Sequence, residues 1–180
     1  ETVGPPFKGN EVKIAEDGEI LVRGENVMLG YWNKKEETEK VIINGWLHTG
    51  DIGEIDPNDG YLKITDRKKD IIVSAGGDNI SPAKIENMIT NEPEIDQCMV
   101  YGDKKNYLVA LIVSEKEINK EKIKLIIENI NKSLTLIEKI KKFTLIHEEF
   151  TIENGMLTPT LKLKRKEIIK NYKQQLENLY

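Results

Sequence analysis

The first third of the chain consists of short apolar runs separated by turn residues. The runs that fit β-strands are 12–14, 20–23, 53–55 and 61–65. Two strong turn signals, Asp17-Gly18 and Pro57-Asn58-Asp59-Gly60, lie between these runs. Residues 33–43, with glutamates and a lysine on one side, predict the one helix of this region. The pattern predicts a small β-rich unit over residues 1–65.

From residue 71 onward, helical and strand patterns are mixed. The predicted strands are 97–102, 107–113 and 143–146. The predicted helices are 81–91, a segment with Ile123, Ile126, Ile127 and Ile130 on one face, and a terminal segment with Ile168, Ile169, Tyr172, Leu176 and Leu179 on one face. This order is typical of a compact α+β domain.

A short, highly charged segment joins the two regions. Residues 66–70 read Asp-Arg-Lys-Lys-Asp, which is too polar for a core element and predicts a domain boundary. The apolar, β-branched residues 71–73 predict a buried strand, and Gly76 and Gly77 then allow backbone conformations closed to other residues. Ser81-Pro82 is a helix start. Taken alone, this stretch is most typical of an ordinary surface connection.

The composition narrows the class of protein. The 27 basic and 31 acidic side chains give a net charge of −4, which argues against a nucleic-acid partner, although the chain is locally basic after Thr160. The one cysteine, Cys98, excludes an internal disulfide and indicates a reducing, cytoplasmic location. Its apolar neighbours predict a buried structural thiol. With only His48 and His147 besides, no zinc site is expected.

The hydropathy of the chain and its first residue lead to two further expectations. No apolar stretch is long enough for a transmembrane segment and no signal peptide is present, which leaves peripheral membrane association open. The chain begins at Glu1 without an initiating methionine, so we expect a fragment entered from an upstream segment.

Four short motifs occur along the chain in an order that is informative about its family. They are GEILVRGENVMLGYWN (18–33), GWLHTGDIG (45–53), DRKKDIIVSAGGDNISPAKIE (66–86) and LTPTLKLKR (157–165). Each is weak alone, but together, at these intervals, they are specific. Over essentially its whole length the chain resembles the C-terminal third of an adenylate-forming acyl-CoA synthetase, in the superfamily that includes firefly luciferase and peptide-synthetase adenylation domains. The forms GWLHTGD, DRKKD, GGDNISP and PTLKLKR make it most similar to long-chain fatty-acid CoA ligases.

The resemblance implies an α+β fold and three regions. Residues 1–65 would be the β subdomain that ends the large adenylation domain, 66–70 the hinge, and 71–180 a lid domain with a small, mainly antiparallel sheet flanked by helices. It also implies two reaction steps: a fatty acid and ATP give an acyl-adenylate and pyrophosphate, and coenzyme A then displaces AMP.

The resemblance also assigns site residues. Asp51 and Arg67 would contact the ribose hydroxyls of ATP, for which a carboxylate has suitable acceptor lone pairs. Lys69 matches the hinge residue about which the lid rotates. Gly76 and Gly77 lie on a loop, 74–79, that would face coenzyme A in the second step.

Lys162 matches the catalytic lysine that stabilises charge on the reacting oxygens, with Lys164 as the alternative because the usual Ser-Gly-Lys ending is altered. Without the resemblance, Lys162 would be taken for part of a solvated basic helix start. Asp78 and His48 depart from the residues common in relatives and receive no role. The aromatic residues Tyr31, Trp32 and Trp46 are expected to pack within the β unit.

Some of the machinery is missing from these 180 residues. Neither a Ser/Thr/Gly-rich phosphate loop nor the Thr-Glu pair that would hold Mg²⁺ is present, so both are expected upstream and the chain alone is expected to be inactive. The alternatives are a ligase that loads a carrier protein, a ligase for short or aromatic acids, and a noncatalytic nucleotide-sensing or partner-binding module.

Overall fold

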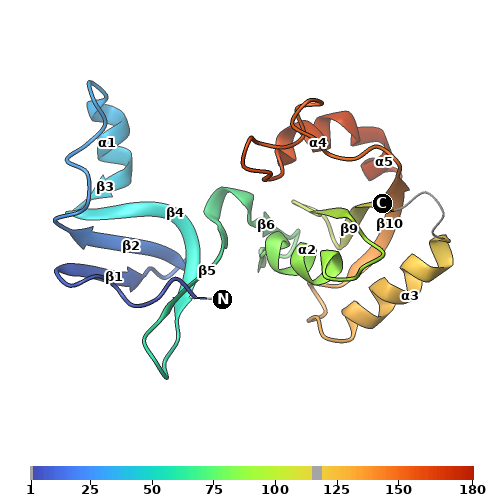
Figure 1. Cartoon of the computed structure of the whole chain (residues 1–180), viewed down its shortest axis with the longest axis horizontal. Coiled ribbons are helices and arrows are strands. Elements are labelled where there is room, and N and C mark those ends of the chain that lie inside the picture. The colour runs from blue at the N-terminus through green and yellow to red at the C-terminus, as the bar shows by residue number, and fades with distance from the viewer. Residues whose placement is uncertain (1, 115–118) are drawn as a thin grey trace. The chain divides into compact units, whose positions relative to one another are not determined.

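The computed structural model describes residues 2–114 and 119–180 and divides into two compact units, Glu1–Lys69 and Asp70–Tyr180 (Figure 1). The first, here called the β unit, contains six elements. They are β1 (Asn10–Ile14), β2 (Glu19–Gly24), α1 (Lys35–Val41), β3 (Ile42–Ile43), β4 (Trp46–Ile55) and β5 (Leu62–Arg67). The strands form one antiparallel sheet in the order β1-β2-β4-β3, and β5 pairs with β4. Lys68–Asp70 form a single 3-10 turn.

The β unit differs from the sequence prediction at β4. This strand spans ten residues, whereas the sequence predicted only the run 53–55, so Thr49, Gly50 and Asp51 lie inside it. The pairing with β2 shifts between Leu21↔His48 and Glu19↔Ile52, which leaves these three residues opposite Ile20 alone. Gly50 has φ +71°, a conformation open to glycine that suits such a bulge.

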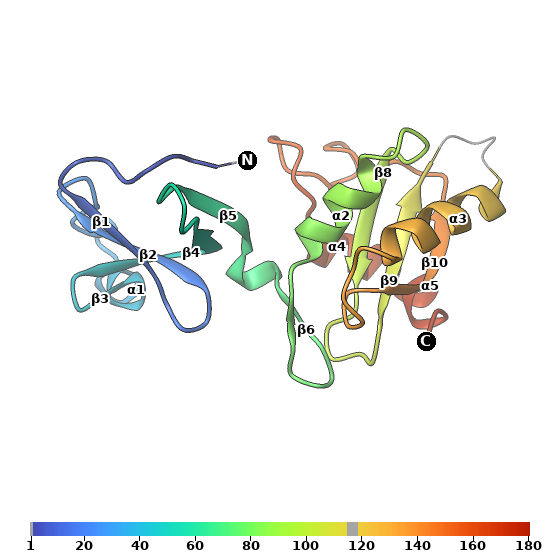
Figure 2. The same ribbon diagram turned by 90° about the horizontal axis from the view of Figure 1, so that it is seen from below.

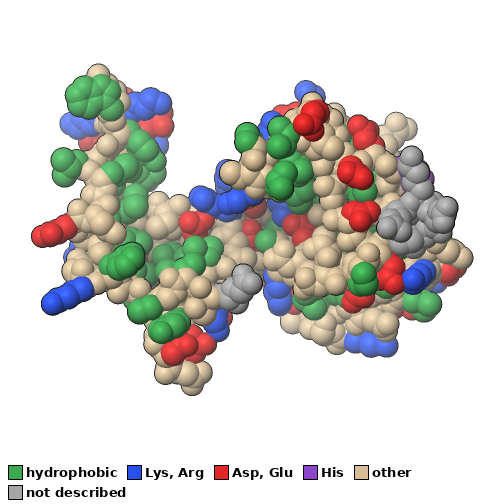
Figure 3. All heavy atoms as spheres, in the orientation of Figure 1, with side chains coloured by type: hydrophobic (Ala, Val, Ile, Leu, Met, Phe, Trp, Pro, Cys, Tyr) green, Lys and Arg blue, Asp and Glu red, His purple; other side chains and the backbone are tan. Residues whose placement is uncertain are grey.

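The β unit buries little apolar surface. Among its described residues, the buried hydrophobic side chains are Ile20 and Leu21, while Phe7, Leu29 and Trp32 are largely exposed. Figure 3 shows hydrophobic side chains on the surface of this unit. The expectation that Trp32 packs within the unit is therefore wrong, since its side chain is 90% exposed. Trp46 does pack, against the cationic groups of Lys13 and Arg23.

The second unit, here called the lid unit, is α+β as predicted. Its elements are β6 (Ile72–Val73), β7 (Asn79–Ile80), α2 (Pro82–Thr90), β8 (Gln97–Tyr101), β9 (Leu108–Val113), α3 (Lys120–Asn131), β10 (Ile140–Ile146), α4 (Arg165–Asn171) and α5 (Lys173–Glu177). The central sheet has the order β10-β9-β8, with β8 antiparallel and β10 parallel to β9. Figure 2 shows α2 and α3 in front of this sheet, and α4 and α5 cover its other face.

All six side chains of β9 are buried, because helices cover both faces of the sheet. One face packs with Ile85 and Ile123 in the first core cluster, and the other with Phe150 and Ile168 in the second. Cys98 is buried and free, as predicted, and burial raises the pKa of its thiol well above the usual range.

Two predicted elements of the lid unit are corrected by the structure. Of the expected buried strand 71–73, only Ile72 is buried and Val73 is exposed, because β6 pairs with β7 alone in a separate two-stranded sheet. The terminal helix is broken at Tyr172, whose φ of −106° and ψ of 20° separate α4 from α5. Its apolar residues still share one side, since Ile168, Tyr172 and Leu176 all join the second cluster.

Candidate functional site

Asp51 and Arg67 lie opposite each other on adjacent strands. They are Cα partners in the β4–β5 ladder, and the Nε of Arg67 is 2.7 Å from Oδ1 of Asp51. The Asp51 side chain is half-buried, and its backbone N–H donates to Oγ1 of Thr49 at 3.1 Å. A carboxylate has about four acceptor positions, so Asp51 can accept further hydrogen bonds beside the one to Arg67. The pair thus offers both donors and acceptors at one point of the sheet.

A buried carboxylate lies beside this pair. Glu19, the first residue of β2, is 4% exposed and accepts a hydrogen bond from the Gly50 N–H at 2.9 Å. Its other oxygen is 2.8 Å from Nδ1 of His48 and 2.9 Å from Nζ of Lys68. Burial raises the pKa of Glu19, but the hydrogen bonds from Lys68, His48 and Gly50 outweigh burial, so the pKa lies below its usual value.

Lys68 connects this network to the end of the β unit. Its Nζ lies 2.7 Å from Oδ2 of Asp17, in addition to its bond to Glu19, and the hydrogen bonds to these two carboxylates raise its pKa. Lys69, the predicted hinge residue, follows directly, is exposed and is the last residue of the β unit. Ion pairs therefore hold the chain as far as Lys68, the residue before the predicted hinge.

The loop 74–79 is closed by hydrogen bonds between its own residues. Ser74 Oγ accepts from the N–H groups of Gly76 and Asp78, each at 3.1 Å, and donates to Oδ2 of Asp78 at 3.0 Å. Asp78, which has no role in the sequence analysis, thus stabilises the loop. Only Gly77 of the two glycines has a positive φ, +88°, so the freedom predicted for both is used at Gly77. A Cβ at Gly76 would lie 3.2 Å from Asp78 Oδ2.

Lys162 lies on a compact loop, residues 157–163, and is exposed. The Thr158 N–H donates to the Lys162 carbonyl at 2.9 Å, and the Lys162 N–H donates to Oγ1 of Thr158 at 3.0 Å. Leu157 and Leu163 pair as a β-bridge at the base, and Leu157 joins the second core cluster. Leu161 has φ +59°, in the left-handed region that favours glycine. The backbone of Lys162 is thus fixed while its side chain extends into solvent.

A largely buried ion pair anchors the chain just after this loop. Arg165, the first residue of α4, donates through both terminal nitrogens to Glu86 of α2, at 2.7 and 2.5 Å. Glu86 also accepts from the Val100 N–H at 2.7 Å. A bidentate contact of this kind fixes both position and direction. It joins α2, β8 and α4 through a residue that follows the Lys162 loop along the chain.

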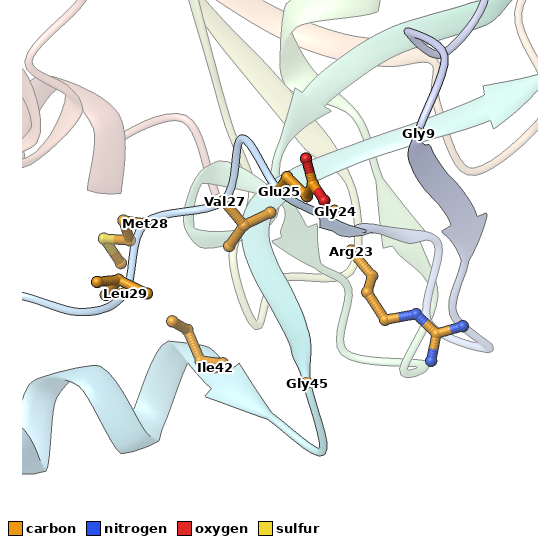
Figure 4. Close-up of a pocket in the computed structure, with 9 residues that line it drawn as sticks. All are labelled: Gly9, Arg23, Gly24, Glu25, Val27, Met28, Leu29, Ile42 and Gly45. Carbon is orange, nitrogen blue, oxygen red and sulfur yellow. The ribbon is translucent and has the colours of Figure 1, made fainter.

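No cation site and no membrane-spanning helix are found within residues 2–114 and 119–180. These ranges hold no cluster of three or more His, Cys, Asp or Glu side chains able to bind a metal ion, and no helix long and apolar enough to cross a membrane. An open hollow of about 420 Å³ lies on the β unit, lined in part by Val27, Met28, Leu29 and Ile42 (Figure 4). None of the predicted site residues lines it.

Some of this arrangement follows from the sequence, and the rest does not. Asp51 and Arg67 are brought together, Gly76 and Gly77 share one loop, and Lys162 lies on another loop of the lid unit. Glu19 and Lys68 were not among the predicted site residues. The one signal for them was that each lies within one of the four motifs. Their contact could not be predicted from local pattern, because Glu19 lies 31 residues from Gly50 and 49 residues from Lys68.

Comparison with known proteins identifies a family and several relatives. The profile of the AMP-binding enzyme C-terminal domain matches residues 69–180. Long-chain-fatty-acid–CoA ligase FadD15 of Mycobacterium tuberculosis is 37% identical over 99% of this chain and 34% of its own length. Long-chain-fatty-acid–CoA ligase 5 of Rattus norvegicus is 37% identical over 99% of this chain and 31% of its own length. The chain therefore spans about a third of the length of these curated relatives.

Solved structures give the same result. The adenylation domain of a carboxylate reductase from Mycobacterium chelonae matches with a TM-score of 0.83 and 27% identity, over 98% of this chain and 31% of that one. The O-succinylbenzoate coenzyme A synthetase of Bacillus subtilis, in complex with AMP, matches with a TM-score of 0.73 and 31% identity, over 92% and 34%. The resemblance drawn from the four motifs is confirmed, and the chain belongs to the family of AMP-binding, adenylate-forming enzymes, with the C-terminal domain of that family at residues 69–180.

Proposed function

We propose that the chain is the C-terminal part of an ATP-dependent long-chain fatty-acid CoA ligase. The enzyme would join a fatty acid to AMP with release of pyrophosphate, and coenzyme A would then displace AMP to give the thioester. The observation that carries this proposal is the cross-strand pair of Asp51 and Arg67 in a chain that also presents Lys162 on a fixed loop. The long-chain-fatty-acid–CoA ligases among the relatives support the choice of substrate class.

Asp51 and Arg67 would bind the ribose of ATP and of the acyl-adenylate. The carboxylate of Asp51 accepts one bond from Arg67 and keeps acceptor positions for two hydroxyl donors. Arg67 in turn retains N–H donors of its own, and its half-exposed guanidinium remains reachable from solvent. In this role the two side chains bind and orient the nucleotide rather than react with it.

Lys162 would stabilise charge on the phosphoryl and carboxylate oxygens during adenylation. The backbone favours Lys162 over Lys164. Leu161 adopts the left-handed conformation that the glycine of the commoner Ser-Gly-Lys ending would adopt without strain, which supports matching the next residue, Lys162, to the lysine of that ending. Lys164 instead occupies the N-cap of α4, where its N–H donates to the Met156 carbonyl.

Lys69 would be the hinge between residues 1–65 and the lid, 71–180, and loop 74–79 would face coenzyme A in the second step. An exposed residue between two compact units can change its backbone torsions with few buried contacts opposing the change. Gly77, at φ +88°, holds the loop in a turn that other residues would strain.

The substrates and setting complete the proposal. ATP, coenzyme A and a fatty acid are the substrates, and Mg²⁺ would accompany ATP, with its ligands outside this chain. A Bacillus subtilis relative was solved with ATP and a magnesium ion. The free, buried Cys98 suits a cytoplasmic location. Peripheral association with membranes is compatible with a fatty-acid substrate.

The test is a product analysis with the intact enzyme that carries this chain. A panel of short, aromatic and long-chain acids is supplied with ATP and either coenzyme A or a carrier protein, and products are resolved by mass. The proposal predicts long-chain acyl-CoA and AMP as main products. Short-chain or aromatic thioesters, or acylated carrier protein, would instead assign one of the related ligases, and the absence of AMP with every acid would indicate a noncatalytic module. The 180-residue chain alone serves as the control and should form no AMP.

A further inference from the structure

Glu19 is an unusual residue for a strand end, because it is a carboxylate that is almost fully buried. It makes three polar contacts, with Nδ1 of His48 at 2.8 Å, the N–H of Gly50 at 2.9 Å and Nζ of Lys68 at 2.9 Å. Burying a charge is costly unless it is paired and hydrogen-bonded. A neutral or apolar residue would avoid this cost if Glu19 served only to fill space.

The partners of Glu19 are the sequence neighbours of the proposed ribose pair. Gly50 directly precedes Asp51 on β4, and Lys68 directly follows Arg67 at the end of β5. One carboxylate group therefore holds the chain beside both members of a pair that are themselves joined at 2.7 Å. A displacement of Glu19 would be transmitted to both strands of that pair.

The backbone at this point needs such a support. Thr49 to Asp51 form the bulge opposite Ile20, and Gly50 lies at φ +71°, so the ladder between β2 and β4 is interrupted there. The contacts that replace the ladder come from two consecutive β2 residues. Glu19 accepts from the Gly50 N–H, and the Ile20 carbonyl accepts from Oγ1 of Thr49 at 2.7 Å.

Resting on the proposed function, we propose that Glu19 is the positioning residue for ribose recognition, holding Asp51 through Gly50 and Arg67 through Lys68. It does not touch the nucleotide. His48 supports Glu19 by donating from Nδ1, which gives this residue the role that the sequence alone did not supply. Asp17 supports Lys68 from the other side at 2.7 Å.

The test compares ATP with 2′,3′-dideoxy-ATP, which lacks both ribose hydroxyls, in the intact enzyme and its Glu19→Gln variant. Glutamine keeps the shape of the side chain and removes the charge that holds Lys68. For ATP we expect kcat/KM to fall about tenfold, the size of one weakened hydrogen bond to a charged group. For the dideoxy analogue, which has no hydroxyls to position, we expect almost no change, so the preference for ATP shrinks by the same factor.

Two further variants keep the test decisive. Glu11→Gln removes an exposed carboxylate of β1 that pairs with Arg23, and should leave both rates unchanged. Lys68→Met removes a half-exposed partner of Glu19 and should lower the ATP preference in the same direction even if Glu19→Gln fails to fold. Equal losses with both nucleotides, or no loss, in Glu19→Gln and in Lys68→Met would overturn the proposal.

The wild-type enzyme separates this proposal from the proposed function. If no carboxylic acid supports AMP formation from ATP, the proposed function fails. If the wild type forms acyl-adenylate but uses the two nucleotides equally well, the ribose role of Asp51 and Arg67 fails, and the positioning role of Glu19 is overturned with it. If the wild type prefers ATP and the Glu19→Gln and Lys68→Met variants keep the full preference, only the positioning role is overturned.

Discussion

The two units hold their predicted site residues by different means. In the β unit the described residues bury just two apolar side chains, and Asp51 and Arg67 are held by the polar network around Glu19. In the lid unit both faces of the central sheet are covered by helices, and the Lys162 loop is anchored on an apolar core and one largely buried ion pair. Polar contacts should therefore decide geometry in the first unit, whereas packing should decide stability in the second.

Removing one cation from each unit should give the largest difference in stability between the two units. Arg165→Met leaves Glu86 charged and largely buried, so the lid unit should lose about 3–5 kcal/mol of unfolding free energy. Lys68→Met removes a partner that is 45% exposed and leaves Glu19 bonded to His48 and the Gly50 N–H, so the β unit should lose only about 1 kcal/mol. Urea titration followed by hydrogen exchange of peptides from each unit measures both losses. Equal losses in the two units would contradict the comparison.

A second test replaces one large apolar side chain in each unit. Ile85→Ala opens a cavity in the lid core and should cost about 2–5 kcal/mol. Trp32→Ala in the β unit should change stability by less than about 0.5 kcal/mol, because this side chain is exposed. Urea midpoints of the two variants of the 180-residue chain provide the measurement. A large loss for Trp32→Ala would mean that the β unit has a core that the structure does not show.

A smaller effect is expected in the pH dependence of β-unit stability. The pKa of Glu19 is lowered in the folded β unit, so its ionised form stabilises that unit above the usual pKa of 4.5, and this contribution is lost as the pH falls through the lowered value. Glu19→Gln should therefore weaken the acid dependence of β-unit hydrogen exchange between roughly pH 6 and pH 3, the range around the usual carboxyl pKa.

Some acid dependence should remain in that variant. A hydrogen bond from Lys68 lowers the pKa of Asp17, and one from Lys63 lowers the pKa of Asp56 to about 2. Peptides from the lid unit give the internal control, because Glu19→Gln should leave their exchange unchanged. An unaltered acid dependence in the β-unit peptides would show that Glu19 is not ionised and held as described.

The sequence predicted the parts of the fold that depend on local pattern. The α2 start at Ser81-Pro82 is confirmed, with Ser81 Oγ accepting from the Lys84 N–H at 3.3 Å. The buried strands around Met99 and Leu111 follow from uninterrupted apolar runs. The α+β class follows in turn from the mixture of these elements.

The features that were missed depend on contacts between distant residues. At the bulge at Gly50, hydrogen bonds to the Glu19 side chain and the Ile20 carbonyl replace the β2–β4 ladder. No residue near Gly50 in the sequence indicates these distant partners. Trp32 was expected to pack because aromatic side chains are usually buried, yet in the structure Trp32 is exposed. The break at Tyr172 was hidden because the apolar spacing continues through it.

We propose that Lys162 acts on the first reaction step, whereas Asp51 and Arg67 bind the nucleotide. This assignment is tested most directly by measuring both half-reactions of the intact enzyme with Lys162→Ala, and with Lys164→Ala as the matched control. Lys162→Ala should suppress acyl-adenylate formation by about 100-fold or more, the scale of one electrostatic stabilising group, and should largely spare thioester formation from supplied acyl-adenylate. Lys164→Ala should affect neither step strongly. Equal loss of both half-reactions in Lys162→Ala, or a selective loss in Lys164→Ala instead, would rule out this role of Lys162.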